Sequence, residues 1–229
     1  MASSLPWRRL VAESVAVIAS ILIAFAIDAA WDARQEKQEL RQLLEGLRSE
    51  LVENQTRARQ GIADAAQAME RLTRFRSDST DVTGMSGGSY VELYLPLVRG
   101  WDVALQTGSL DATISSGKLS LIPDPVTRAS LTSLAADIGD IDRLNSELDR
   151  MGAEAAAVIG EYPGVRHLRG AVEIDRDGIR ALRQDRRLRG LASARFIFMG
   201  GYIYNLSTKV EPRLEEAIGA IERSLAATR

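Results

Sequence analysis

The feature that most limits how this chain can fold is an apolar run near its amino end, WRRLVAESVAVIASILIAFAIDAAWDAR. Between Leu10 and Ala30, only Glu13, Ser14, Ser20 and Asp28 are not apolar. About 20 such residues are enough to cross the ~30 Å hydrocarbon layer of a bilayer as a helix. The apolar character continues around the whole circumference, whereas a core helix of a soluble protein is usually apolar on one side. The run therefore predicts a transmembrane helix over residues 10–31.

The residues that flank the run suit the two faces of a bilayer. Trp7 and Trp31 lie about 36 Å apart at ~1.5 Å per helical residue, which matches the spacing of the aromatic belts at the interfaces. Arg8 and Arg9 precede the run. We expect all four side chains at the membrane interface, with residues 1–9 as a short flank.

A cleaved signal peptide is the alternative interpretation of the same residues. The pair Arg8-Arg9 would form its basic region and Ala24-Phe25-Ala26 its cleavage site. The apolar core of a signal peptide has only about 7–15 residues, however, which is shorter than this run. A retained span is the favoured prediction.

One row inside the span predicts helix–helix contact. Ala12, Ala16, Ser20 and Ala24 recur every four residues, and Asp28 continues the row. Small side chains at this spacing let two helix backbones approach closely, which drives association in lipid. We expect self-association or docking on another membrane protein, although alanine is also simply common in this chain.

The rest of the chain, residues 32–229, predicts an all-α domain. Only 5% of the residues are aromatic and six are proline, which favours helices over strands. Periodicity predicts that the first helix continues to Arg76 and that others cover 90–106, 125–162 and 177–226, the last kinked at Pro212. Long helices of alternating direction favour an up-and-down bundle.

The first helix carries a coiled-coil-like apolar seam. Its members are Leu40, Leu44, Leu47, Leu51, Ala58, Ile62, Ala65, Met69 and Leu72. Gln55 and the alanines weaken the seam, so packing against other helices of the same chain is at least as reasonable as a free coiled coil. A second apolar stretch, 191–207, is interrupted by Arg195 and Gly200-Gly201 and predicts a core helix rather than a second span.

Nothing in the sequence predicts an enzyme, a cofactor or a metal site. There is no cysteine, which excludes thiolate catalysis and cysteine metal ligands. The segment ATISSGKLS resembles a phosphate-binding loop, but Ala112 replaces a required Gly and Leu119 a required Ser or Thr. The one histidine, His167, stands between arginines and is typical of a loop residue.

A run of arginines forms a possible basic patch. Its candidate members are Arg166, Arg169, Arg180, Arg183, Arg186 and Arg187. Such a patch could face anionic lipid or an acidic partner, while a solvated helix face is the simpler interpretation. The formal charge of −2 shows no overall bias toward nucleic acid, so no nucleic-acid partner is expected.

Two segments resemble a family of bacterial single-span membrane proteins known only as a domain of unknown function. The first is E-x-x-x-V-I-x-x-I-L-I-A-F-x-I-x-x-x-W-x-x-x-R, from Glu13 to Arg34, and the second is SSGKLSLIPDPVTRASL, from Ser115 to Leu131. The family often has Gly where Ala19 or Ser20 stands here. The resemblance implies a retained anchor with a helical domain in the bacterial inner membrane, and it implies no activity.

The sequence gives weaker evidence for the orientation and the function of the protein than for its fold. Arg8 and Arg9 precede the span, and Arg34, Lys37 and Arg41 follow it, so the positive-inside rule only slightly favours an inside amino end and a periplasmic domain. Two function classes remain open. The first is a membrane-anchored structural or interaction protein that oligomerises or docks on a membrane partner. The second is a sensory or ligand-binding ectodomain, whose pocket the aromatic residues around Trp101 and 196–204 would line.

Overall fold

The computed structural model describes residues 7–77, 87–101, 103–162, 165–168, 171–174 and 176–227. Its elements are α1 (Trp7–Arg76), α2 (Gly87–Val98), α3 (Gly108–Ser115), the 3₁₀ turn η1 (Lys118–Leu121), α4 (Pro125–Gly160), β1 (Val165–Leu168), β2 (Ala171–Ile174), α5 (Arg176–Gln184), α6 (Arg186–Asn205), the π-helical turn η2 (Leu206–Val210) and α7 (Glu211–Ala227). The predicted all-α bundle behind one long first helix is confirmed.

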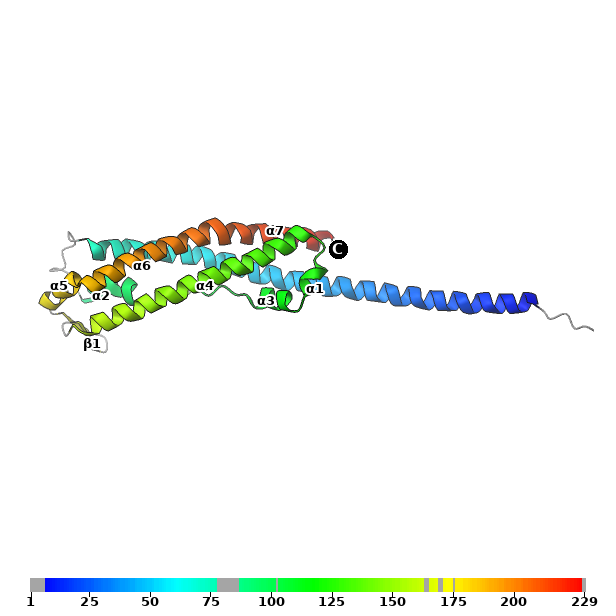
Figure 1. The fold of residues 1–229 in the computed structure, drawn as a ribbon, viewed down its shortest axis with the longest axis horizontal. Helices are drawn as coiled ribbons and strands as arrows, with labels where there is room; N and C mark the ends of the chain where they lie inside the picture. Colours follow the sequence, from blue (N-terminus) through cyan, green and yellow to red (C-terminus); the bar gives the residue numbers. More distant parts are fainter. Residues whose placement is uncertain are drawn as a thin grey trace, which may run out of the picture.

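Four layers run alternately up and down. α1 and α4 point toward the same end of the bundle, and α6–α7 returns between them on one side (Figure 1). On the other side, α2, an extended segment and α3 together form the fourth layer. α1 extends far beyond the other helices, at the end of the bundle where the carboxyl end also lies (Figure 1).

The buried face of α1 begins only at Leu44. From there its buried residues, apart from Glu50, alternate three and four apart, a spacing that keeps one face toward the core over nine intervals. They are Leu44, Leu47, Leu51, Asn54, Ala58, Gly61, Ala65, Ala68, Leu72 and Phe75. The predicted seam is thus buried within the chain's own bundle, with Ile62 and Met69 partly buried at its margin.

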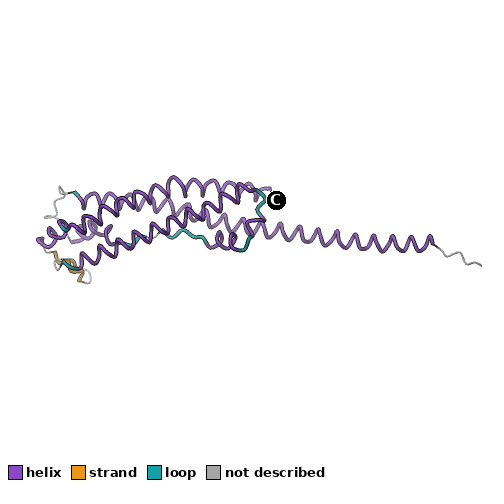
Figure 2. Tube along the Cα trace, viewed as in Figure 1, coloured by secondary structure: helices purple, strands orange, loops and turns teal. Residues whose placement is uncertain are grey.

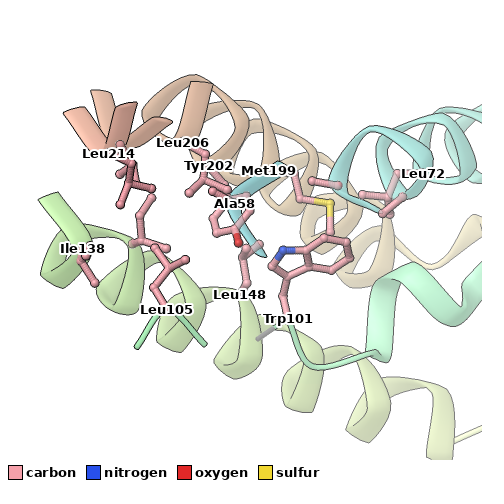
Figure 3. Packing of buried hydrophobic residues seen from close by; sticks show 14 of the residues in the cluster. Ala58, Leu72, Trp101, Leu105, Ile138, Leu148, Met199, Tyr202, Leu206 and Leu214 are labelled. Carbon is pink, nitrogen blue, oxygen red and sulfur yellow. The ribbon is translucent and has the colours of Figure 1, made fainter. Parts of the chain in front are cut away.

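The core is filled by the residues predicted for α4 and for α6–α7, and by aromatic side chains. Trp101 meets the Tyr202 ring edge-on, with the ring centroids 6.2 Å apart, at the centre of the layers (Figure 3). Both side chains are buried. The aromatic residues that a ligand pocket would have used therefore pack as core at these two positions.

Three predictions of local structure were wrong. The second helix was expected to reach Gln106, but α2 ends at Val98, because Pro96 lacks an N–H donor and Gly100 follows. The loop expected around His167 is instead an antiparallel hairpin, with His167 in β1 opposite Val172. The fourth helix is divided: α5 ends at Gln184, and a new helix begins after Asp185.

Pro212 has its effect one turn earlier than its own position. A proline cannot donate to the carbonyl four residues before it, and its ring crowds that carbonyl. Here the preceding turn, η2, widens to π-helical geometry, which is how helices often absorb an irregular residue. The ribbon changes direction between α6 and α7 at this point (Figure 1), as a kink at Pro212 predicts.

A buried arginine joins three layers. The Arg195 side chain is 1% exposed and donates to the backbone oxygens of Pro96 (2.6 Å), Arg99 and Leu148. Burial lowers the pKa of Arg195 to about 10, although the charge of Asp149 acts in the opposite direction. Three charge-assisted bonds offset part of the desolvation cost and close the carboxyl end of α2.

Gly152 allows this junction to form. A Cβ at this position would lie 3.1 Å from the Val98 oxygen and 3.2 Å from Nη1 of Arg195, both closer than ordinary contact. Gly139, also within α4, has open space around the equivalent point. A close contact therefore requires glycine at position 152, whereas no contact requires it at position 139.

We expect Gly152→Ala to lower the free energy of unfolding by about 1–2 kcal/mol, because α2 and Arg195 must move away from α4. Gly139→Ala, the matched control, should raise it by up to ~1 kcal/mol through helix propensity alone. Urea unfolding of the full chain in detergent, followed by circular dichroism, measures both. Equal effects of the two substitutions would contradict the close junction at Gly152.

Candidate interaction surfaces

The projecting part of α1 is the most unusual surface of the molecule. Every side chain described between Trp7 and Gln38 is exposed, and both Trp7 and Trp31 are 68% exposed. The segment is long and apolar enough to cross a membrane. The structure thus presents the predicted span as an isolated helix that no other part of the described chain covers.

The predicted small-residue row lies on this uncovered helix. Ala16, Ser20, Ala24 and Asp28 are exposed, and the side chain of Ala12, like those of Arg8 and Arg9, lies outside what the structure describes. The Ser20 hydroxyl donates to the Ala16 oxygen at 2.8 Å. A hydroxyl satisfied within its own helix can face lipid or a second helix without losing a hydrogen bond.

The predicted basic patch is divided among internal contacts. Arg180 pairs with Asp177, Arg183 donates to the Phe75 and Ser77 oxygens at the end of α1, and Arg187 pairs with two carboxylates. Arg186 is exposed. The Arg166 side chain and all of Arg169 lie outside the described residues. Arg183 and Arg187 therefore join α5 and α6 to neighbouring elements, whereas the Arg180 pair lies within α5.

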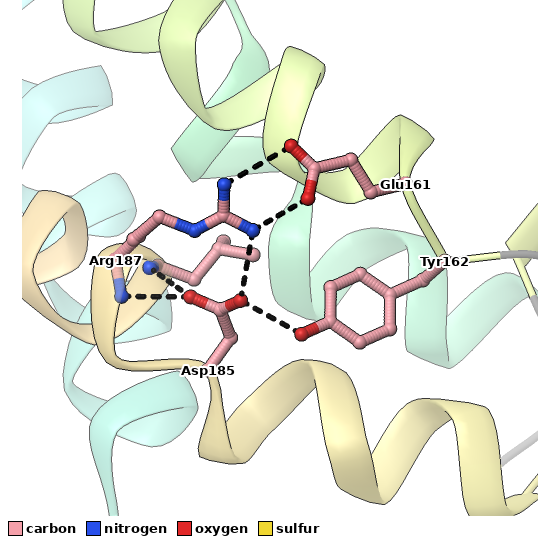
Figure 4. A network of polar contacts seen from close by, with 5 residues as sticks. Glu161, Tyr162, Asp185 and Arg187 are labelled. Atoms are coloured by element: carbon pink, nitrogen blue, oxygen red, sulfur yellow. Dashed lines mark hydrogen bonds and ion pairs between the residues drawn. The ribbon is translucent and has the colours of Figure 1, made fainter.

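A polar network fixes the start of α6. Asp185 caps the helix by accepting from the backbone N–H groups of Arg187 (2.7 Å) and Leu188 (3.1 Å) (Figure 4). The Tyr162 hydroxyl donates to the same carboxylate at 2.7 Å, and Arg187 holds Glu161 through two nitrogens. The Tyr162 bond is the main cause that lowers the pKa of Asp185 to about 2. The bonds made by Tyr162 and Glu161 join the end of α4 to the start of α6.

The fourth layer is held by polar side chains of α1. We call the extended segment made of Trp101 and residues 103–107 the strap; it runs as a loop along the side of the bundle (Figure 2). Asn54, fully buried, pairs with both backbone groups of Gln106: its Nδ2 donates to the Gln106 oxygen at 2.6 Å, and its Oδ1 accepts from the Gln106 N–H at 2.7 Å. Arg57 donates to the Ala104 oxygen at 2.9 Å.

Glu50 and Asp149 complete the attachment of the strap. Glu50 accepts from the N–H groups of Ser109 (2.6 Å) and Leu110 (3.0 Å), which caps α3 from another helix. On the α4 side, Asp149 accepts from the Trp101 N–H at 2.6 Å. Glu50, Asn54 and Arg57 are four and three residues apart, on one face of α1. The sequence signal that could have found them is Asn54, a polar residue inside a leucine seam.

Comparisons with protein-family models, with curated proteins and with solved structures found no match. The resemblance to the bacterial single-span family therefore stays a prediction.

We expect Asn54→Leu to lower the free energy of unfolding by about 1–3 kcal/mol, because the backbone N–H and oxygen of Gln106 would each lose a hydrogen bond to a fully buried side chain. Thr56→Ala, on the exposed side of the same helix, should change it by less than ~0.5 kcal/mol. Amide hydrogen exchange should show faster exchange in 103–110 for the first variant. Unchanged protection there would mean that the side-chain pairing does not hold the strap.

Proposed function

We propose that this chain is a membrane-anchored, non-enzymatic structural or interaction protein, whose helical bundle is held at the bilayer and oligomerises or docks on a membrane partner. The observation that carries the proposal is the uncovered apolar segment of α1. Its large exposed side chains include Val15, Ile18, Leu22, Phe25 and Ile27, each at least 56% exposed.

The amount of exposed apolar surface on this segment favours a position within a lipid bilayer. Covering one large apolar side chain gains about 1.5–3 kcal/mol, so the nine from Val11 to Ile27 represent on the order of 20 kcal/mol. Net domain stability is only about 5–15 kcal/mol. A chain with this segment in water would favour aggregation over the monomer, whereas a bilayer covers all sides of the helix at once.

The connection to the bundle also supports an anchor. Partial burial starts at Glu39, eight residues beyond Trp31, which is about 12 Å along a helix. From Trp7 to Glu45, α1 contains no proline or glycine that could interrupt it. The bundle would therefore stand directly above the headgroups on a continuous helix. We infer a bacterial inner membrane with the bundle in the periplasm, following the basic pair before the span.

We expect the full chain to sediment with membranes and to stay there after carbonate extraction, since a span with ~20 apolar residues inserts stably. A phosphatase fused after Arg229 should be active and a fluorescent protein at the same place dark, which reports a periplasmic bundle. Recovery of the chain in the soluble fraction without its first residues would favour a cleaved signal peptide. A fluorescent, phosphatase-negative result would keep the anchor but reverse the orientation.

We expect Ala16→Leu with Ser20→Leu to reduce self-association at least tenfold in a membrane two-hybrid assay, because larger side chains separate the helix backbones. The matched control, Val15→Leu with Ile18→Leu, keeps bulk on the other faces of the same helix and should leave the signal unchanged. If both pairs give the parental signal, the small-residue row does not form a contact between copies.

A further inference from the structure

Beyond its first turn, from Gly190 onward, the outer face of α6 has no exposed charge. Between Arg189 and Lys209 the only charged residue is Arg195, and its side chain is 1% exposed. In the same stretch Ile197 is 71% exposed and Tyr204 61% exposed. Since 26% of the chain is charged, an uncharged face of this length is unusual. Such faces mark interaction sites on soluble domains.

The residues on this face have coiled-coil spacing. They alternate four and three residues apart and none is buried: Gly190, Ala194, Ile197, Gly201, Tyr204 and Thr208. Each follows a buried residue of the same helix turn by two positions, or ~200° around the axis. The stripe is therefore opposite the core. We call these six residues the α6 stripe.

Its two glycines have open space beside them in the described part of the chain, as Gly46 and Gly139 also do. Glycine inside a helix costs about 1 kcal/mol relative to alanine. A Cβ built at Gly190 or Gly201 would meet nothing within 4 Å, unlike one at Gly152. A close backbone approach by a second helix is the ordinary reason for glycine at such positions.

We propose that the α6 stripe binds the α6 stripe of a second copy of this chain, parallel and in register. This rests on the proposed function, because two anchors in one bilayer make both α6 helices point the same way. The charge pattern fits a second copy: an uncharged face meets an identical uncharged face, so no charge loses its water. The large side chains of Ile197 and Tyr204 in one copy then pack into the space beside the small residues Gly201 and Ala194 of the other copy, as in parallel two-stranded coiled coils.

The size of the contact suits an anchored protein rather than a soluble dimer. The stripe covers 18 residue steps, or about 27 Å of helix, and one such face buries less than the ~800 Å² per partner of stable soluble dimers. Attachment to the same membrane raises the effective concentration and allows a weaker contact to form.

Cysteine cross-linking tests the proposal, since the chain has no cysteine of its own. A disulfide needs Cα atoms within about 7 Å, and in-register pairing brings each stripe residue to its own copy. In isolated membranes, we expect Ile197→Cys, Gly201→Cys or Tyr204→Cys to give at least tenfold more disulfide-linked homodimer than Thr132→Cys or Ser146→Cys, both on exposed positions of α4. Adding Gly201→Glu to Tyr204→Cys should remove the dimer, because two carboxylates would face each other.

The outcomes separate this inference from the proposed function. If Ser20→Cys in the span cross-links and no stripe cysteine does, the stripe contact is wrong and the anchored oligomer stands. Stripe cysteines that link only to a different protein also overturn the second-copy assignment. An unchanged dimer yield with Gly201→Glu does the same. Release of the chain into the soluble fraction overturns both, since the parallel arrangement depends on the anchor.

Discussion

The continuity of one helix controls the rest of this structure. α1 changes from a segment that is apolar on all sides to one that is apolar on a single face, without a break in its backbone hydrogen bonds. The change takes place between Trp31 and Leu44, where charged residues appear and burial begins. Everything else in the bundle packs against the second part, directly or through one layer. The first part is covered by no other part of the described chain.

The bundle itself combines an apolar core with polar attachments at its weakest layer. Three layers are long helices that bury leucine, isoleucine and alanine in regular seams. The fourth is made of α2, the strap and α3, so part of its backbone has no partner within a helix of its own. Side chains of α1 and α4 compensate by binding its backbone directly, and Arg195 closes the end of α2. Hydrogen bonds to an otherwise unpaired backbone stabilise mainly by preventing the loss of buried partners.

Periodicity in the sequence predicted the long helices well, because apolar seams repeat with the same spacing whatever they pack against. It located α1, the start of α4 at Asp124-Pro125 and most of the residues that are buried. It failed where a tertiary contact overrides a local preference. Residues 99–101 and 103–106 are predicted as helix but form none, and Asn54 and Asp149 from distant parts of the chain bind the backbone of Gln106 and Trp101. The hairpin at 165–174 is too short to show a pattern of its own.

The surfaces were harder to predict than the core. The sequence predicts a core helix for 191–207. In the structure this helix is apolar on two opposite sides, and packing within the bundle explains only the apolar residues of the buried side. In the arginine-rich region the sequence shows charge but not partners, so Asp185 and Glu161, which neutralise Arg187, were not linked to it. Which carboxylate meets which guanidinium depends on helix ends that come together only in the folded chain.

A helix that continues from the apolar arm to the far end of the bundle acts as a lever. From Leu40 to Arg76 it is about 54 Å long, so a 10° change in its inclination moves the distal hairpin sideways by roughly 9 Å. Transmembrane helices are tilted by about 20° on average. In the proposed membrane setting, a change in the tilt of α1 would therefore move the distal end of the bundle over the membrane surface.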